Sequence, residues 1–224
     1  ATIGVGIPVL IALAEWMGIC RNDSHYTLMA RRWTRGYVIT VAVGVVSGTA
    51  LGLQINLLWP NFMRIAGQAI GLPMFMEIFA FFFEAIFLGI YMYTWDRFKP
   101  KIHFLFIIPV VIGASCSALF ITLVNSFMNA PQGFEIVDEI IGNVQPLKAM
   151  FTPASPTKVS HVLVSAYLTS AFIIAGSAAY ALLKGKRHIY YKKVLNMTLF
   201  AALVFAISTF LIGDLSGKYL AKYQ

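Results

Sequence analysis

The sequence predicts an all-α protein, a multi-pass bundle of six membrane-spanning helices that form one domain over residues 1–224. Hydrophobic residues make up 59 % of the chain and charged residues only 12 %, about half the roughly 25 % that is usual in soluble domains. The mean hydropathy is +0.77. Six apolar runs stand out, and a bilayer-spanning helix needs about 20 such residues. These observations exclude a water-soluble globular protein.

The expected spans follow one another with short connections, except for one long connection. In chain order they are residues 1–20, 36–58, 69–95, 103–128, 159–183 and 192–213. The first run begins inside a hydrophobic stretch, so the natural start of the chain is expected to lie before Ala1. The long connection 129–158 is rich in Pro, Asn and Gln, and its apolar stretch 136–141 is expected to form a short helix along the surface.

The basic residues predict how the chain is oriented in the membrane. The connections after the first, third and fifth runs hold Arg21, Arg31, Arg32, Arg35, Arg97, Lys99, Lys101, Lys184, Lys186, Arg187, Lys192 and Lys193, and the opposite side holds only Arg64, Lys148, Lys158, Lys218 and Lys222. Short loops rich in Lys and Arg face the cytoplasm. Both ends of this chain are therefore expected on the outer side. The net charge of +8 then reflects topology, and no nucleic-acid partner is expected.

Two carboxylates lie inside the apolar stretch "GLPMFMEIFAFFFEAIFLG", at Glu77 and Glu84. Seven residues are about two helical turns, or about 10 Å, so both should lie on one helix face. Carboxylates in hydrocarbon are costly, which favours proton relay or contact with a cofactor. Two protonated acids that hydrogen-bond neighbouring helices remain the structural alternative. For Glu15, near the basic end of its run, snorkelling to the interface and a functional role are both open.

His161 follows "TPASPTK" and should lie about one turn inside the outer boundary of its helix. A neutral imidazole there can ligate a haem iron, and a simple interfacial histidine is the alternative. His25, His103 and His188 fall in or beside basic loops and are expected to be solvated.

Small residues at four-residue spacing, Gly44, Gly48 and Gly52, lie on one face of the second run. Such a face allows close packing of another helix, or of a flat macrocycle. Cys20 and Cys116 lack the spacing of metal ligands, and a structural disulfide between them is not expected.

Several motifs together resemble one protein family. The run "LQINLLWPNFMRIAGQAIGLPMFMEIFAFFFEAIFLGIYMYTWDRF" is similar to the second and third helices of subunit I of cytochrome bd-type quinol oxidases. The similarity continues in "GASCSALFITLVNSFMNAPQG", "SHVLVSAYLTSAFIIAGSAAYALLKG" and "IGDLSGK". The motifs occur in matching order over essentially the whole chain, which resembles the N-terminal, six-helix portion of that subunit.

The resemblance implies a respiratory terminal oxidase of a bacterial or archaeal cell membrane. Such enzymes oxidise quinol at the outer face, pass electrons from a low-spin haem b to a high-spin haem b and haem d, and reduce dioxygen to water with cytoplasmic protons. It implies that His161 is an axial ligand of the low-spin haem b. Glu84 matches the acid of the proton path, Glu77 the acid beside haem d, and Ser117 a further group of that path. A second membrane subunit (subunit II), and in some members a small single-helix subunit, are the implied partners.

The chain also departs from the family pattern. By the resemblance, one histidine ligand would fall before Ala1, and the quinol loop, a methionine ligand and a glutamate ligand would fall after Gln224. "LQIN" stands where many members have "EFQF", and "NSFMNAP" where many have "W-M-Q-x-P". We therefore expect a fragment of the subunit or a divergent partial homologue. A proton-coupled transporter or channel, and a scaffold subunit without cofactors, are the alternative functions.

Overall fold

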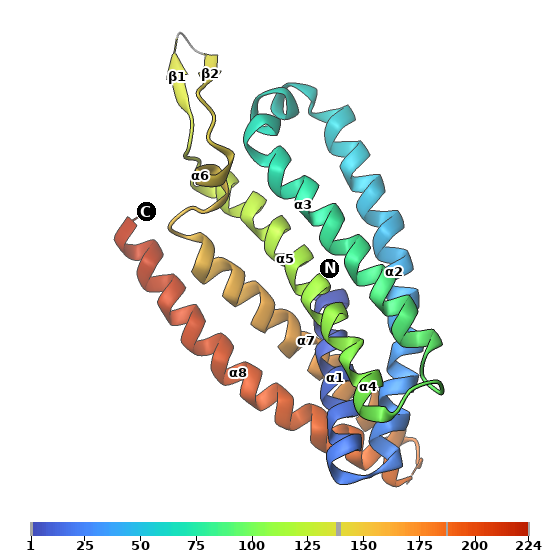
Figure 1. The fold of residues 1–224 in the computed structure, drawn as a ribbon. Coiled ribbons are helices and arrows are strands. Elements are labelled where there is room, and N and C mark those ends of the chain that lie inside the picture. The colour runs from blue at the N-terminus through green and yellow to red at the C-terminus, as the bar shows by residue number, and fades with distance from the viewer. Residues whose placement is uncertain (1, 138–139, 187, 224) are drawn as a thin grey trace.

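The computed structural model describes residues 2–137, 140–186 and 188–223, and it is a bundle of long helices with short connections (Figure 1). The helices are α1 (Thr2–Arg21), α2 (Ser24–Leu58), α3 (Pro60–Tyr93), α4 (Pro100–Leu105), α5 (Ile107–Asn129), α6 (Pro146–Met150), α7 (Ser155–Leu183) and α8 (Ile189–Tyr223). Within these described ranges, six helical segments are long and apolar enough to cross a membrane, with α4 and α5 counted as one. The predicted all-α, multi-pass class is confirmed.

Several helices extend beyond the expected spans. α2 begins at Ser24 rather than at residue 36, and α3 begins at Pro60 rather than at residue 69. Asp23 caps α2 by accepting a hydrogen bond of 3.0 Å from the backbone N–H of His25, and Pro60 occupies the first turn of α3, where proline is tolerated. Hydropathy detects only the apolar part of a helix, so it does not predict the more polar turns that continue the helix beyond that part.

The long connection between α5 and α7 corrects one prediction. The stretch 136–141 was expected to be a surface helix, but β1 (Glu135–Val137) and β2 (Ile140–Gly142) pair there as an antiparallel hairpin. Residues 138 and 139 lie outside the described part of the chain. The β-branched residues of "EIV" and "IIG" favour strands, and this local preference outweighs an apolar stretch that is too short to form a stable helix.

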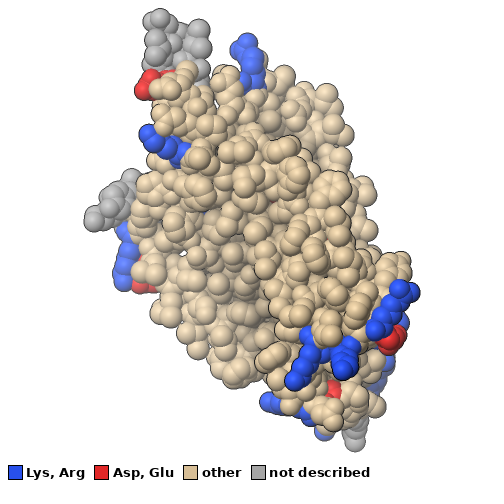
Figure 2. All heavy atoms as spheres, in the orientation of Figure 1, with Lys and Arg blue, Asp and Glu red and all other residues tan. Residues whose placement is uncertain are grey.

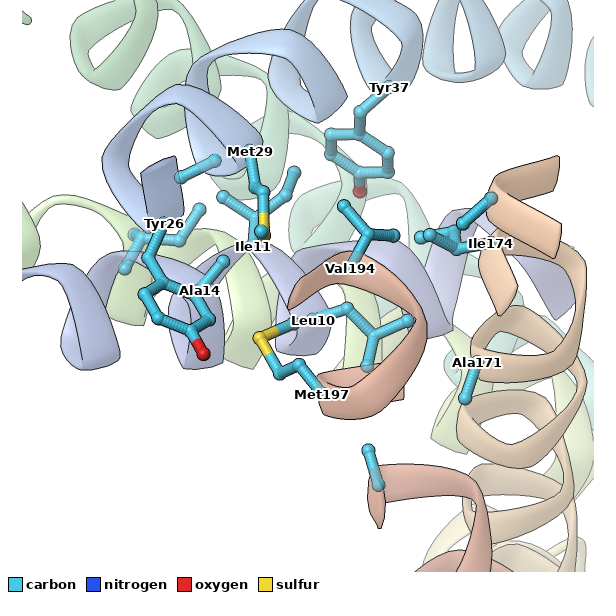
Figure 3. Packing of buried hydrophobic residues seen from close by; sticks show 14 of the residues in the cluster. Leu10, Ile11, Ala14, Tyr26, Met29, Tyr37, Ala171, Ile174, Val194 and Met197 are labelled. Carbon is cyan, nitrogen blue, oxygen red and sulfur yellow. The ribbon is translucent and has the colours of Figure 1, made fainter. Parts of the chain in front are cut away.

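The main hydrophobic core lies at the end of the bundle that carries most basic residues, where α1, α2, α7 and α8 converge (Figures 1 and 3). Its members include Leu10, Ile11, Ala14, Tyr26, Met29, Tyr37, Ala171, Ile174, Val194 and Met197. At the same end the Lys193 ammonium of α8 pairs with the Asp23 carboxylate between α1 and α2. The Lys193 hydrogen bond, and then the His25 backbone N–H, hold the pKa of Asp23 below its ordinary value.

The surface between the two ends of the bundle is strongly apolar and exposes many large hydrophobic side chains. Figure 2 shows Lys, Arg, Asp and Glu towards the ends of the molecule, with a broad uncharged band between them. The C-terminal half of α2 is especially exposed: an added Cβ at Gly44, Gly48 or Gly52 would meet no atom within 4 Å. Within the described residues no helix packs on this glycine face, so the expected helix packing is not found there.

Helices α3 and α5 pack closely where Gly113 of α5 lies against Glu84 of α3. A Cβ placed at Gly113 would lie 2.8 Å from Cβ and 2.9 Å from Cα and N of Glu84. The contacting atoms are mostly backbone, which cannot move aside as a flexible side chain can. Glycine at position 113 therefore sets the distance between α3 and α5.

We expect Gly113→Ala to destabilise the folded chain by about 1–3 kcal/mol, because the added methyl group overpacks the α3–α5 contact. The measurement is the thermal unfolding midpoint in detergent, followed by the helical circular dichroism signal. Gly176→Ala is the matched control, since a Cβ there meets nothing within 4 Å and alanine favours the helix. Equal midpoints for Gly113→Ala and the unmodified chain would contradict the prediction.

Candidate functional site

Glu84 is a buried acid at the meeting point of several helices. Its side chain projects from the middle of α3, and the residue is 5 % exposed. The hydroxyl of Tyr37, on α2, is bonded to Oε1 of Glu84 and also lies 3.0 Å from the carbonyl oxygen of Gly4 on α1. Tyr37 is itself fully buried. One tyrosine hydroxyl thus connects the first three helices at this carboxyl group.

Glu77 lies two turns earlier on α3 and is partly exposed. The Ser117 hydroxyl, on α5, donates a 3.2 Å hydrogen bond to its Oε1. Gly113, against Glu84, is one turn before Ser117 on the same helix. Both acids therefore face α5, as the seven-residue spacing predicted, and the structure brings together three of the predicted site residues.

His161 projects from α7 towards α8, whereas the two acids of α3 face α5. Its Nδ1 is buried and has no hydrogen-bond partner among the residues that the structure describes. On α8, a Cβ placed at Gly213 would lie 3.5 Å from Cε1 of the imidazole. Buried polar atoms normally have a partner, and a metal-bound imidazole uses one nitrogen for the metal. A histidine with an unsatisfied nitrogen beside a glycine fits the requirements of a haem ligand.

The other potential metal ligands of the described residues do not gather into a protein-only metal site. No group of three or more His, Cys, Asp or Glu gathers within the described residues. Cys20 and Cys116 are free, as expected. A site built only from protein ligands is therefore not found in the described part of the chain, whereas a macrocycle that needs one axial imidazole requires no such cluster.

Sequence reasoning missed a third polar cluster, between α1, α3 and α4. Oε1 of Glu15 lies 2.6 Å from Nδ1 of His103, and Oε2 accepts a 2.7 Å hydrogen bond from the Tyr91 hydroxyl. Glu15 and His103 are 3 % and 2 % exposed. The expectation that His103 is solvated is wrong, and Glu15 does not snorkel to the interface. The two residues are 88 positions apart, so no spacing within one helix could reveal the pair.

A bundle of long apolar helices that carries acids in its interior defines the chain as a multi-pass helical membrane protein. Comparison with known proteins identifies its family. The chain belongs to the cytochrome bd terminal oxidase subunit I family, whose model matches residues 1–224. The resemblance seen in the sequence motifs is thereby confirmed.

Relatives from two bacteria and one solved structure are similar over the whole chain. A putative cytochrome bd menaquinol oxidase subunit I of Bacillus subtilis (strain 168) is 38 % identical, over 100 % of this chain and 52 % of the relative. The cytochrome bd-II ubiquinol oxidase subunit 1 of Escherichia coli (strain K12) is 29 % identical, over 98 % and 43 %. The structure of bd oxidase from Geobacillus thermodenitrificans matches with a TM-score of 0.97 and 64 % identity, over 100 % of this chain and 52 % of that one. The chain spans about half the length of these relatives.

We expect Tyr37→Phe to lower stability by about 1–3 kcal/mol, because it leaves a buried carboxyl oxygen of Glu84 without its donor. Thermal unfolding in detergent measures the change. Tyr93→Phe is the control, since Tyr93 is 74 % exposed and its hydroxyl can be hydrated. An unfolding midpoint for Tyr37→Phe equal to that of Tyr93→Phe would contradict a stabilising role of this hydrogen bond.

Proposed function

We propose that this chain is the haem-bearing part of subunit I of a cytochrome bd-type terminal oxidase. In this proposal the complete enzyme oxidises membrane quinol and reduces dioxygen to water with protons taken from the cytoplasm. The observation that carries the proposal is the burial of Glu84 in the middle of α3, bonded to Tyr37. A carboxylic acid at such a position is functional by default, and the family membership of the chain supports an oxidase.

His161 would hold the iron of the low-spin haem b, and Glu77 would lie beside haem d. The unsatisfied Nδ1 of His161 supports its assignment as the ligand. A bound haem supplies reversible one-electron transfer. The proposal requires a low-spin haem b, a high-spin haem b and haem d in the complete enzyme.

The side chains of α3 and α5 would move the protons that oxygen reduction consumes. Glu84 can take up a proton and release it in this buried position, as a general acid or base does. Tyr37 orients that carboxyl group through its hydrogen bond. Ser117 donates to Glu77, so the second acid is also held in place by a hydroxyl that can exchange protons.

The basic end of the bundle would face the cytoplasm, by the positive-inside rule. Proton entry from that side and quinol oxidation on the other would make turnover electrogenic. A second membrane subunit (subunit II), with a small single-helix subunit in some assemblies, would complete the enzyme. The exposed apolar face of α2, which has nothing within 4 Å of its glycines, supports partners or lipid on that side.

We expect His161→Ala to abolish the low-spin haem b bands in the reduced-minus-oxidised optical spectrum of the assembled enzyme. Alanine has no nitrogen to bind iron, while the helices should fold, as far-UV circular dichroism would check. His188→Ala, at an exposed position, should leave the spectrum intact. A normal low-spin signal in His161→Ala would reject the ligand assignment. A preparation of the unmodified complex without haem bands would favour a transporter or scaffold subunit.

We expect Glu84→Gln to slow oxygen consumption by about tenfold or more, since glutamine cannot carry a proton and general acid–base groups contribute about 10²–10⁴-fold. Haem content should be retained, because the amide has nearly the shape of the acid. An oxygen electrode with excess quinol measures the rate. Glu135→Gln, at an exposed position at the start of β1, is the control, and wild-type turnover in Glu84→Gln would count against the proton role.

A further inference from the structure

The function proposed above gives no role to the buried pair formed by Glu15 and His103. The two side chains are only 4 % and 3 % exposed, and 2.6 Å separates Oε1 from Nδ1. The Tyr91 hydroxyl occupies Oε2 of Glu15 at 2.7 Å. The imidazole also contacts the rings of Tyr91 and Trp95, at centroid distances of 4.4 Å and 4.5 Å. The pair is thus held between α1, α3 and α4, with Trp95 of the α3–α4 connection against the imidazole.

The backbone shows how many protons this pair holds. Nε2 of His103 lies 2.9 Å from the carbonyl oxygen of Tyr91, and a carbonyl can only accept, so Nε2 carries a hydrogen. The contact between Nδ1 and Oε1 then needs one further proton, which lies on Glu15 in a neutral pair or on His103 in an ion pair. In either form, one shared proton joins the acid to the imidazole.

A cavity connects this proton to the basic end of the protein. It has a volume of about 940 Å³, and its wall includes Glu15 and His103 together with the exposed residues Pro100 and Lys101. The charged groups around it are Asp23 between α1 and α2, Arg31 on α2, and Lys99 and Lys101 at the start of α4. The charged and polar side chains in its partly apolar wall, together with its size, suit several water molecules. Solvent at the basic end therefore has a route to the pair.

Polar groups also lead from the pair towards Glu84. Tyr91 and Glu84 are seven residues apart on α3, and the buried Leu88 lies between them on the same face. An alternative route runs along α2. The buried Thr34 lies beside the Tyr91 hydroxyl, and its own hydroxyl donates a 2.8 Å hydrogen bond to the carbonyl oxygen of Ala30, so the side chain must rotate to pass a proton on. Tyr37, one turn further on, is bonded to Glu84. No hydrogen bond joins Thr34 to Tyr37 among the described residues, so a proton crosses this interval by way of water or a side-chain rotation.

We propose that Glu15 and His103 form the proton-loading site of the path to Glu84. This inference rests on the proposed function. When Glu84 gives up its proton, the shared proton of the pair moves through Tyr91, Thr34 and Tyr37 to the Glu84 carboxylate. A proton from cavity water then restores the pair. Each cycle moves one proton from the cavity water to Glu84 and requires no electron from these residues.

The test compares Glu15→Gln with Glu15→Asp in the complete oxidase, with its full subunit I and partner subunits. We expect Glu15→Gln to lower quinol-driven oxygen consumption by about tenfold or more, with the reduced-minus-oxidised haem spectrum unchanged. The remaining rate should show an increased solvent isotope effect and should fall more steeply with rising pH. Glu15→Asp should restore most of the rate. Asp96→Asn is the control, because Asp96 is an exposed carboxylate paired with Arg31 at the same end.

Glu84→Gln, measured in parallel, separates failure of this inference from failure of the proposed function. Wild-type turnover in Glu15→Gln together with slow turnover in Glu84→Gln would overturn only the loading site, and wild-type turnover in both would overturn both. If Glu15→Gln loses its haem, Tyr91→Phe decides, since it removes a single hydroxyl. Slow turnover with a normal spectrum in Tyr91→Phe supports the path, and wild-type turnover overturns it.

Discussion

The structure depends on one constraint: a carboxyl group inside an apolar bundle must receive its hydrogen bonds from the protein, because hydrocarbon offers none. Tyr37 meets this requirement for Glu84 and contacts the Gly4 carbonyl with the same hydroxyl. This geometry holds only if α1, α2 and α3 keep fixed distances. Gly113 sets the corresponding distance on the α5 side. The packing distances between these helices therefore also determine where the Glu84 carboxyl group lies.

A buried glutamate bonded to a buried tyrosine of another helix occurs twice among the described residues. Glu84 on α3 is bonded to a tyrosine of α2, and Glu15 on α1 is bonded to a tyrosine of α3. Both tyrosines are fully buried, so each phenol ring fills core volume while its hydroxyl serves an acid on another helix. This arrangement keeps two titratable groups in the protein interior without a charged partner of opposite sign on the same helix.

Much of the fold could be predicted from the sequence because the membrane imposes a simple rule on length and hydropathy. The six spans follow from that rule, and the seven-residue spacing predicts Glu77 and Glu84 on one helix face; the structure adds that this face lies against α5, where Ser117 donates to Glu77. The rule says nothing about polar helix extensions such as the start of α2 at Ser24, nor about a short hairpin in a loop. It also cannot pair Glu15 with His103, since their contact depends on how α1 and α4 meet in three dimensions.

The pairing of Asp23 with Lys193 has a consequence for the basic end of the bundle. Because Lys193 holds the pKa of Asp23 below its ordinary value, the ion pair contributes its stability above that ordinary value and loses it only as the pH falls through the lowered one. Throughout the neutral range the link between α8 and the α1–α2 connection stays charged and closed. A change of pH within the neutral range therefore leaves the Asp23–Lys193 ion pair charged, and the contact between α8 and the α1–α2 connection does not depend on the protonation of groups that titrate there.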